Sequence, residues 1–340
     1  MSRKINLGVV GATGVVGETF LNLIDERDFP YGEIKLFASE NSKGQIKKFM
    51  DREITLEVLR EGCFDGLDLV FFSSGDEISA EWAPKAVKAG AFAVDNSAAF
   101  RMNADFPLVV PEVNGDLLPK PGSPTIIANP NCSTIQLVVA LAPLAKKFGL
   151  KAVRVASYQS VSGAGRDGIE ELLTTTRIAL EAEEVTTSKV FPAPIPFNCI
   201  PQIGKIGEDG FCTEEIKIMN ETNKILRLPD LPVSAFTVRV PTLNSHAEAV
   251  WATLGKSDLT LKDVVDSLDQ SPGIEVMKAD QSPAYPTQKQ TSGLDPVFIG
   301  RFHRDRSDKS TWMMWVVSDN LRKGAALNGI QIAERIFDLA

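Results

Sequence analysis

Cys132 and His246 are the two residues whose chemistry and surroundings point most clearly to a reaction. Cys132 lies in IANPNCST at residues 127–134, directly before a stretch with helical periodicity. A helix N-terminus carries about half a positive charge, which stabilises a thiolate over a thiol. His246 follows a strand-like run that contains Arg239. Histidine suits proton transfer near neutral pH, so we expect a Cys132 nucleophile with His246 as its proton-transfer partner.

The N-terminal glycines form a pattern that is typical of a dinucleotide-binding turn. Gly8, Gly11, Gly14 and Gly17 recur at every third position between an apolar run and a helical stretch. Gly11 permits a tight turn, and Gly14 lets a pyrophosphate approach backbone amides at a helix N-terminus. The spacing alone also fits a plain strand–helix turn. Together with a thiolate, a dinucleotide site predicts aldehyde oxidation or acyl reduction through a thioester.

The end of the second predicted strand bears on which dinucleotide binds. Ser39, Ser42 and Lys43 offer donors to a 2′-phosphate, whereas Glu40 would repel one if it faced the pocket. Alternatively, this is a solvated loop with Glu40 directed outward. We therefore predict NADP, with NAD as the alternative.

Several charged residues are candidates for binding an anionic substrate. Arg239 could grip a carboxylate through two parallel hydrogen bonds. Arg101 follows a predicted strand end, and Glu214 and Lys217 share a helix face because they are three residues apart. The alternatives are an exposed arginine and a solvated ion pair. We expect the second histidine, His303, to be a surface residue.

The first part of the chain alternates strands with helices. Strands are predicted at residues 5–10, 34–38, 67–73 and 91–95, and helices at 15–26 and 80–89. This alternation predicts an α/β fold with a doubly wound parallel sheet of the Rossmann type. Small and polar clusters follow the strands at residues 11–14, 38–42, 73–75 and 95–101, where ligands bind in such sheets.

The pattern changes after Cys132. A helix is predicted at 135–148, beginning at Ser133 or Thr134 and bent by Pro143, and residues 192–201 are a proline-rich loop. Strands are predicted at 151–160, 235–240, 247–254 and 312–318, and a final helix spans 320–339. We predict a dinucleotide-binding domain at 1–130 and a second α/β domain at 131–319. The helix at 320–340 is expected to return to the first domain.

Composition excludes several classes of protein. The net charge of −8 argues against non-specific nucleic-acid binding. No apolar run is long enough to predict a membrane span, and the first strand begins too early for a signal peptide. The four cysteines lack metal-binding spacing, so we expect free thiols, no metal site and a cytoplasmic protein.

The motifs in this order resemble the aspartate-β-semialdehyde dehydrogenase family over nearly the whole chain. The markers are GATGVVG at 11–17, DNSAAFR at 95–101, VVPEVN at 109–114, NPNCST at 129–134, SYQSVSGAG at 157–165, NCIPQ at 198–202, EEIK at 214–217, RVPTLNSH at 239–246 and SDNLRKGAA at 318–326. The resemblance implies a second domain like that of glyceraldehyde-phosphate dehydrogenase, through which a homodimer forms. It implies NADPH-dependent, reversible reduction of L-aspartyl-4-phosphate to L-aspartate-4-semialdehyde and phosphate. That step leads to lysine, threonine, methionine and diaminopimelate.

The resemblance also implies a role for each matching residue. Cys132 is the nucleophile, His246 the acid and base, and Gln159 positions the acyl intermediate. Arg239 binds the substrate carboxylate and Glu214 its amino group. The remaining roles are phosphate or substrate binding by Arg101, Asn131 and Lys217, and cofactor binding by Gly11, Thr13, Gly14, Val15, Val16, Ser39, Asn41, Ser42, Ser162, Gly163 and Asn320.

Two positions depart from the family pattern. Relatives often carry arginine where Asn41 stands, which weakens the prediction of strict NADP preference. They also often have glycine where Ser245 precedes the histidine, and serine suits that position unless the backbone requires positive φ.

Two alternative functions are N-acetyl-γ-glutamyl-phosphate reductase and a non-catalytic paralogue. Glu214 disfavours the first because it suits a free amino group, and the presence of Cys132, Gln159 and His246 disfavours the second.

Overall fold

The computed structural model describes residues 4–181, 185, 188–278 and 280–339. The chain divides into two compact units, Met1–Asn131 with Ala325–Ala340, and Cys132–Gly324. Each unit is described by itself. Residues 1–3 and 340, which the sequence predictions included, lie outside the described residues.

The first unit is built on a seven-stranded sheet of order β3-β4-β2-β1-β5-β6-β7. The strands β2, β1, β5, β6 and β7 run parallel, as the predicted Rossmann-type sheet requires, and β4 joins them in parallel beside β2. The antiparallel β3–β4 pair was not predicted. The strands are β1 Ile5–Val10, β2 Tyr31–Phe37, β3 Ile46–Phe49, β4 Arg52–Glu57, β5 Leu69–Phe72, β6 Phe92–Asp95 and β7 Ile126–Ala128.

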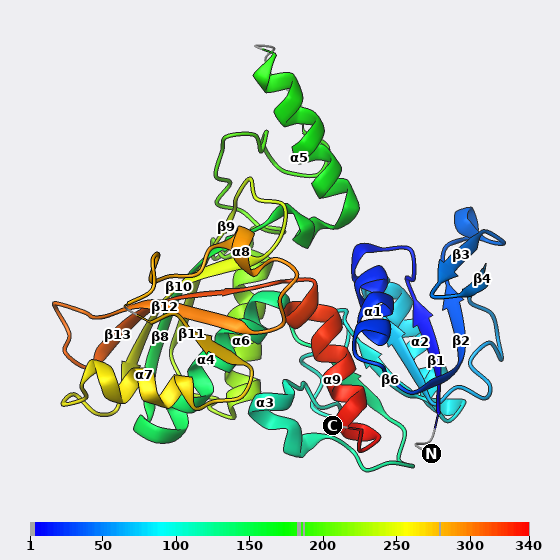
Figure 1. The fold of residues 1–340 in the computed structure, drawn as a ribbon, viewed down its shortest axis with the longest axis horizontal. Coiled ribbons are helices and arrows are strands. Elements are labelled where there is room, and N and C mark those ends of the chain that lie inside the picture. The colour runs from blue at the N-terminus through cyan, green and yellow to red at the C-terminus, as the bar shows by residue number, and fades with distance from the viewer. Residues whose placement is uncertain (1–3, 182–184, 186–187, 279, 340) are drawn as a thin grey trace. The chain divides into compact units, whose positions relative to one another are not determined.

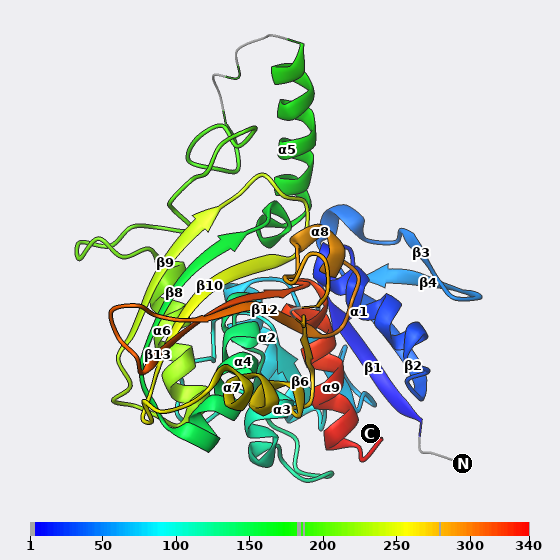
Figure 2. The same cartoon turned by 60° about the vertical axis from the view of Figure 1, so that its left-hand side comes forward.

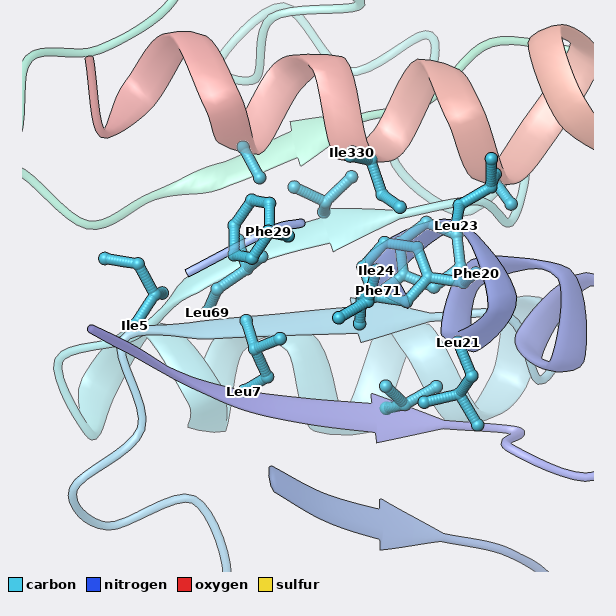
Figure 3. Close-up of a cluster of buried hydrophobic side chains, with 14 of the residues drawn as sticks. Ile5, Leu7, Phe20, Leu21, Leu23, Ile24, Phe29, Leu69, Phe71 and Ile330 are labelled. Atoms are coloured by element: carbon cyan, nitrogen blue, oxygen red, sulfur yellow. The ribbon is translucent and has the colours of Figure 1, made fainter. Parts of the chain in front are cut away.

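Helices cover both faces of this sheet (Figure 1). Helices α1 (Val15–Glu26) and α9 (Leu327–Ile336) pack over one face, and α2 (Asp76–Lys88) covers the other. Figure 3 shows the apolar cluster under α9, where Ile330 meets the side chains of Phe20 and Phe71. Those two rings stack with centroids 4.1 Å apart. The short helix α3 (Pro111–Asn114) contacts α9.

The C-terminal helix differs from the predicted 320–340 span. It begins at Leu327 and ends at Ile336, and the preceding residues Arg322–Ala326 form a π-helical turn. Good helix formers through this stretch concealed the change of winding, because propensity does not distinguish α from π hydrogen bonding. The helix packs in the core of the first unit.

The second unit is built on a six-stranded sheet of order β11-β12-β13-β10-β8-β9. Its strands are β8 Leu150–Gln159, β9 Val233–Arg239, β10 His246–Leu254, β11 Ile274–Val276, β12 Val297–Arg304 and β13 Thr311–Ser318. Helices α4 (Cys132–Phe148), α6 (Thr213–Leu226) and α7 (Leu261–Asp269) cover one face (Figure 2). Helix α5 (Gly165–Leu180) follows β8, and α8 (Gln288–Thr291) precedes β12. No described helix is long and apolar enough to cross a membrane.

Helix α4 begins one residue earlier than predicted, at Cys132 itself, and runs unbroken past Pro143. It is buried along most of its length, so packing against the sheet outweighs the hydrogen bond that proline removes. The cysteine therefore stands at the first helical position.

The close packing of α9 yields a test of the first unit. A Cβ at Gly329 would lie 2.5 Å from Cε2 of Phe71, which is fully buried. We expect Gly329→Ala to lower the free energy of unfolding by about 1–3 kcal/mol, although alanine is the better helix former. Urea unfolding measures it. In a Phe71→Leu background the same change should cost clearly less, and equal costs in both backgrounds would contradict this packing argument.

Candidate active site

The register of three strands brings Gln159, Arg239 and His246 side by side. Gln159 pairs with Arg239 on β9 and with His246 on β10. Directly paired residues point to the same face of a sheet, and here that face is the one covered by α4 and α6. All three side chains are buried. The structure thus brings together three of the residues that the sequence predicted separately.

The environment of His246 defines its protonation. The backbone N–H of Ser160 donates to Nδ1 at 3.1 Å. Because an amide N–H only donates, Nδ1 carries no proton and the neutral ring carries its proton on Nε2. Burial, and after it the positive charge of Arg239, lower the pKa of His246 from 6.5 to about 3. The imidazole is therefore a neutral hydrogen-bond donor at physiological pH.

Arg239 is a buried cation beside this ring. Its Nη1 donates to the carbonyl of Ser160 at 2.6 Å. Burial lowers the pKa of Arg239, and the nearby Glu214 and Cys132 oppose that shift electrostatically. A Cβ at Gly163 would lie 2.8 Å from Nη1 of Arg239 and 3.3 Å from Nε2 of His246. Glycine at 163 keeps open the space between the guanidinium and the imidazole.

Glu214 and Lys217 form an ion pair of 3.6 Å on α6, as their spacing predicted. The pair is not the solvated pair of the alternative interpretation, because the side chain of Glu214 is only 10% exposed while that of Lys217 is 38% exposed. The next residue, Glu215, accepts from the backbone N–H groups of Cys212 and Thr237. Glu215 therefore holds the start of α6 against β9, a role that the sequence analysis missed.

Cys132 is half-buried and is one of four free thiols. A Cβ at Gly324 would lie 3.0 Å from the Cβ of Cys132. The π-helical turn that contains Gly324 therefore lies directly against the cysteine backbone. A larger residue at 324 would crowd the cysteine. Helix α4 places the thiol at its positive end.

A hydrogen-bonded group connects the predicted cofactor residues Ser162 and Asn320. Nδ2 of Asn320 donates to the Ser162 hydroxyl at 3.0 Å, and the Ser160 hydroxyl lies 3.1 Å from Oδ1 of Asn320. Ser160 also bonds to His246, so this group touches the catalytic candidate directly. Ser160 lies within the motif SYQSVSGAG at 157–165, but no role was predicted for it.

Glu248 is a second residue that the sequence analysis missed. It lies two residues after His246 on β10 and is fully buried, and its carboxyl oxygens have no hydrogen-bond partner within the part of the chain that the structure describes. Burial raises the pKa of Glu248 well above 4.5, and this effect exceeds the opposing effect of the neighbouring Gln136 amide. Glu248 is therefore a neutral acid at this face. The period of two from His246 was the available signal.

The backbone conformation of Ser245 decides whether serine suits this position. Its φ is +67°, in the left-handed region that favours glycine. Such a conformation costs about 1–2 kcal/mol for a residue with a Cβ. The backbone at 245 does require positive φ, so serine is unfavourable there. His246 therefore follows a strained peptide.

The first unit contains the predicted dinucleotide turn. Gly11 has φ +82°, and a Cβ there would lie 2.7 Å from the carbonyl oxygen of Ser73. A Cβ at Gly14 would meet only the carbonyl oxygen of Gly11, at 3.4 Å, and Gly14 is the exposed N-cap of α1 without a side-chain cap. A helix N-terminus open at this point fits a pyrophosphate. Thr13, Val15 and Val16 are half-buried around it.

The loop after β2 carries the predicted 2′-phosphate residues. Glu40–Ser42 is a short 3-10 turn that begins after Ser39 and includes Asn41. Lys43 pairs with Glu40 at 3.4 Å, and both side chains are exposed. Glu40 is directed to solvent, as in the alternative interpretation, but it also neutralises the lysine.

Arg101 and Asn131 also belong to the first unit, and both are buried. Arg101 donates from Nε to the carbonyl of Asn129 at 2.9 Å and from Nη2 to the carbonyl of Asn96. These bonds fix the guanidinium near the end of β6. His303, by contrast, is exposed as predicted.

The tautomer of His246 can be tested directly. We expect ¹⁵N NMR to show a neutral ring protonated on Nε2 from about pH 8 to about pH 5. The variant His303→Asn assigns the signal, since the chain has two histidines. The folded pKa lies below the unfolded value of 6.5, so His246 stabilises the fold above pH 6.5 and loses this contribution as pH falls toward about 3. An imidazolium signal at pH 6 would refute the assignment.

Comparison with known proteins places this geometry in a family. Residues 6–120 match the family "Semialdehyde dehydrogenase, NAD binding domain", and residues 141–323 match "Semialdehyde dehydrogenase, dimerisation domain". The aspartate-semialdehyde dehydrogenase of Aquifex aeolicus is 44% identical over 96% of both chains, and that of Bacillus subtilis is 41% identical over 100% of this chain and 99% of its own. The crystal structure of aspartate semialdehyde dehydrogenase II from Vibrio cholerae, complexed with ASA, superposes with a TM-score of 0.92 at 41% identity and covers 98% of both chains. A structure of the Candida albicans enzyme with NADP has a TM-score of 0.76 at 25% identity, covering 99% of this chain and 100% of its own. The chain belongs to the aspartate-semialdehyde dehydrogenase family.

Proposed function

We propose that this protein catalyses the reversible, NADPH-dependent reduction of L-aspartyl-4-phosphate to L-aspartate-4-semialdehyde and phosphate. The step serves lysine, threonine, methionine and diaminopimelate biosynthesis. The observation that carries the proposal is the buried Arg239, which lies close to Glu214, Cys132 and His246. A buried cation and a buried carboxylate in one site match the two charged groups of a free amino acid.

Substrate recognition follows from these charges. The Arg239 guanidinium binds the α-carboxylate and Glu214 binds the α-amino group. Lys217, Arg101 and Asn131 bind the phosphate. An acetylated amino group carries no positive charge for the buried Glu214 to bind, which disfavours an N-acetyl-γ-glutamyl substrate.

Cys132 is the nucleophile of this mechanism. Its thiolate, stabilised at the start of α4, attacks the acyl carbon of the substrate. The carbon–sulfur bond forms as the carbonyl π electrons move to oxygen, and collapse of this adduct breaks the bond to phosphate. The product is a thioester on Cys132 that Gln159 holds in place. Positive charge from Lys217 and Arg101 stabilises the departing phosphate.

The family resemblance implies that His246 is the acid and base, and we propose that it acts here as a neutral hydrogen-bond donor. Its Nε2–H donates to the oxygen that becomes negative in the tetrahedral adduct. NADPH, when bound, supplies the hydride that reduces the thioester. Collapse of the resulting thiohemiacetal anion expels Cys132 as a thiolate, so the nucleophile begins and ends in the same protonation state.

The first unit supplies the cofactor site of the proposal. Gly11, Thr13, Gly14, Val15 and Val16 surround the start of α1, where the pyrophosphate binds. Ser39, Asn41 and Ser42 are placed at the adenosine end, and Ser162, Gly163 and Asn320 remain predicted cofactor contacts from the family resemblance. We propose NADP as the preferred cofactor in a cytoplasmic enzyme.

The open face of the second sheet supports a homodimer. Tyr158 and Phe236 are exposed there, with relative exposures of 36% and 57%, and Trp251 and Trp315 are half-buried on the same face. Large aromatic residues gathered on an uncovered sheet are typical of a protein interface. We propose that two copies of this chain associate through it.

The test of the function is phosphate-dependent reduction of NADP⁺ by the purified protein with aspartate semialdehyde. We expect Cys132→Ser to lower turnover by at least about a thousandfold, because a serine hydroxyl has no comparable anionic fraction. Mass spectrometry of wild type with aspartyl phosphate and without NADPH should find the acyl group on Cys132. Cys199→Ser, which changes an exposed thiol, is the matched control. An adduct on Cys63, Cys199 or Cys212 instead would exclude the assignment.

Cofactor preference has its own test at the loop after β2. We expect Asn41→Arg to raise the NADP/NAD ratio of specificity constants and Lys43→Ala to lower it. Each change should be about fivefold or less, because exposed charges are screened by solvent. Removing Glu40 by Glu40→Gln frees Lys43 from its ion pair and should raise the ratio. If wild type prefers NAD, or if no substitution moves the ratio, the loop does not bind a 2′-phosphate.

A further inference from the structure

The peptide that leads into His246 is strained, and its own side chain does not relieve the strain. Ser245 has φ +67° and is fully buried. Among the described residues its hydroxyl group has no hydrogen-bond partner. A left-handed residue of this kind persists only where neighbouring groups hold it. The group that holds it must act on its backbone.

The side-chain amide of Gln288 binds that backbone. Nε2 of Gln288 lies 2.8 Å from the carbonyl oxygen of Ser245, 3.0 Å from that of Tyr158 and 3.1 Å from the Thr242 hydroxyl. Carbonyl oxygens only accept hydrogen bonds, so the amide must present its NH₂ group to them. A glutamine, and not a glutamate, is required at this position.

The two carbonyls belong to residues immediately before the catalytic candidates. Tyr158 precedes Gln159 on β8, and Ser245 precedes His246 at the start of β10. Gln159 and His246 are directly paired across these strands. One amide therefore ties together the two strands at the point where their side chains enter the site.

Gln288 is itself held on both sides. Trp315 Nε1 donates to the carbonyl of Pro286 at 3.0 Å. On the other side, Asn244 Nδ2 donates to the Ser292 hydroxyl at 3.0 Å, and the backbone N–H of Gly293 donates to Asp319 at 2.7 Å. The segment 286–293 is thus anchored to β13 and to the turn before His246, and it can transmit a fixed position to Gln288.

We propose that Gln288 is a positioning residue of the reaction, which holds the strained Ser245 peptide and thereby aims the His246 ring. This positioning role rests on the proposed function, and it does not require Gln288 to contact the substrate. The imidazole keeps one orientation only while Nδ1 stays in line with the Ser160 N–H, 3.1 Å away. A shift of the Ser245 peptide would break that alignment, and hydrogen bonds weaken steeply with angle.

The strain supplies a discriminating experiment. We expect Gln288→Leu to lower kcat by about tenfold to a hundredfold with little change in the KM for aspartate semialdehyde, because geometry and not binding is lost. Glycine adopts positive φ without strain, so Ser245→Gly should leave kcat near that of wild type. The double variant should recover most of the loss. Gln290→Leu, on the same short helix, is the control, because its side-chain amide oxygen accepts from the Thr287 hydroxyl and not from the turn before His246.

Two outcomes would overturn the proposal: an unchanged kcat in Gln288→Leu, or a loss that is the same in the Ser245→Gly background. The second would show that Gln288 merely staples the segment. A measurement that needs no turnover tests the positioning role of Gln288 separately from the proposed function. The His246 ¹⁵N signals should report a mixture of ring states in Gln288→Leu and a single Nε2–H tautomer in wild type and in the double variant. Wild type without semialdehyde activity would refute the function alone, while unaltered signals in Gln288→Leu would refute the positioning role.

Discussion

The register between β8 and β10 is the constraint on which the site depends. It sets His246 opposite Gln159 and Glu248 opposite Ser157, and the parallel pairing with β9 adds Arg239. Because side chains alternate between the two faces of a strand, a slip of one residue would move this whole set to the open face. The ladder is held by burial of the alternate positions under α4 and α6. The chemistry therefore follows from the same apolar packing that selects the fold, and no separate device is required to assemble these residues.

Burial then decides the charge of each group. Arg239 keeps its charge because Glu214 and Cys132 offset desolvation, whereas Glu248 and His246 have no such compensation and are neutral. For Glu248 the folded pKa exceeds the unfolded value, so it destabilises the fold increasingly as pH rises above 4.5. One face of one sheet thus carries a cation, a neutral base and a neutral acid. Burial disfavours the charged form of all three groups, and only arginine, with its high ordinary pKa, stays charged.

Sequence reasoning was strongest where a pattern is local. The strand and helix periods predicted the main elements, and residues 15–26 were predicted with the bounds that α1 has. Glu214 and Lys217 form the expected pair because they are three positions apart on a helix. Gln288 and Ser160 were beyond such reasoning, because they act through neighbours more than forty residues away in sequence. For Glu248 the period of two from His246 indicated the face of the strand, but not how deeply that face is buried. The π-helical turn at Arg322–Ala326 was not predicted for a different reason: apart from Gly324, its residues are good formers of an ordinary helix.

The tautomer of His246 explains why its orientation matters so much. A histidinium would act by charge, which falls off slowly with distance and depends little on angle. A neutral Nε2–H acts by a directional hydrogen bond, which needs the ring aimed at the oxygen that becomes negative. The proposed reaction requires no net proton at Cys132, because the thiolate that attacks is the thiolate that leaves. A neutral, aimed donor meets this requirement, whereas a charged acid would compete by protonating the thiolate. The strained turn before His246 and the amide that holds it are what such a directional donor demands of the surrounding backbone.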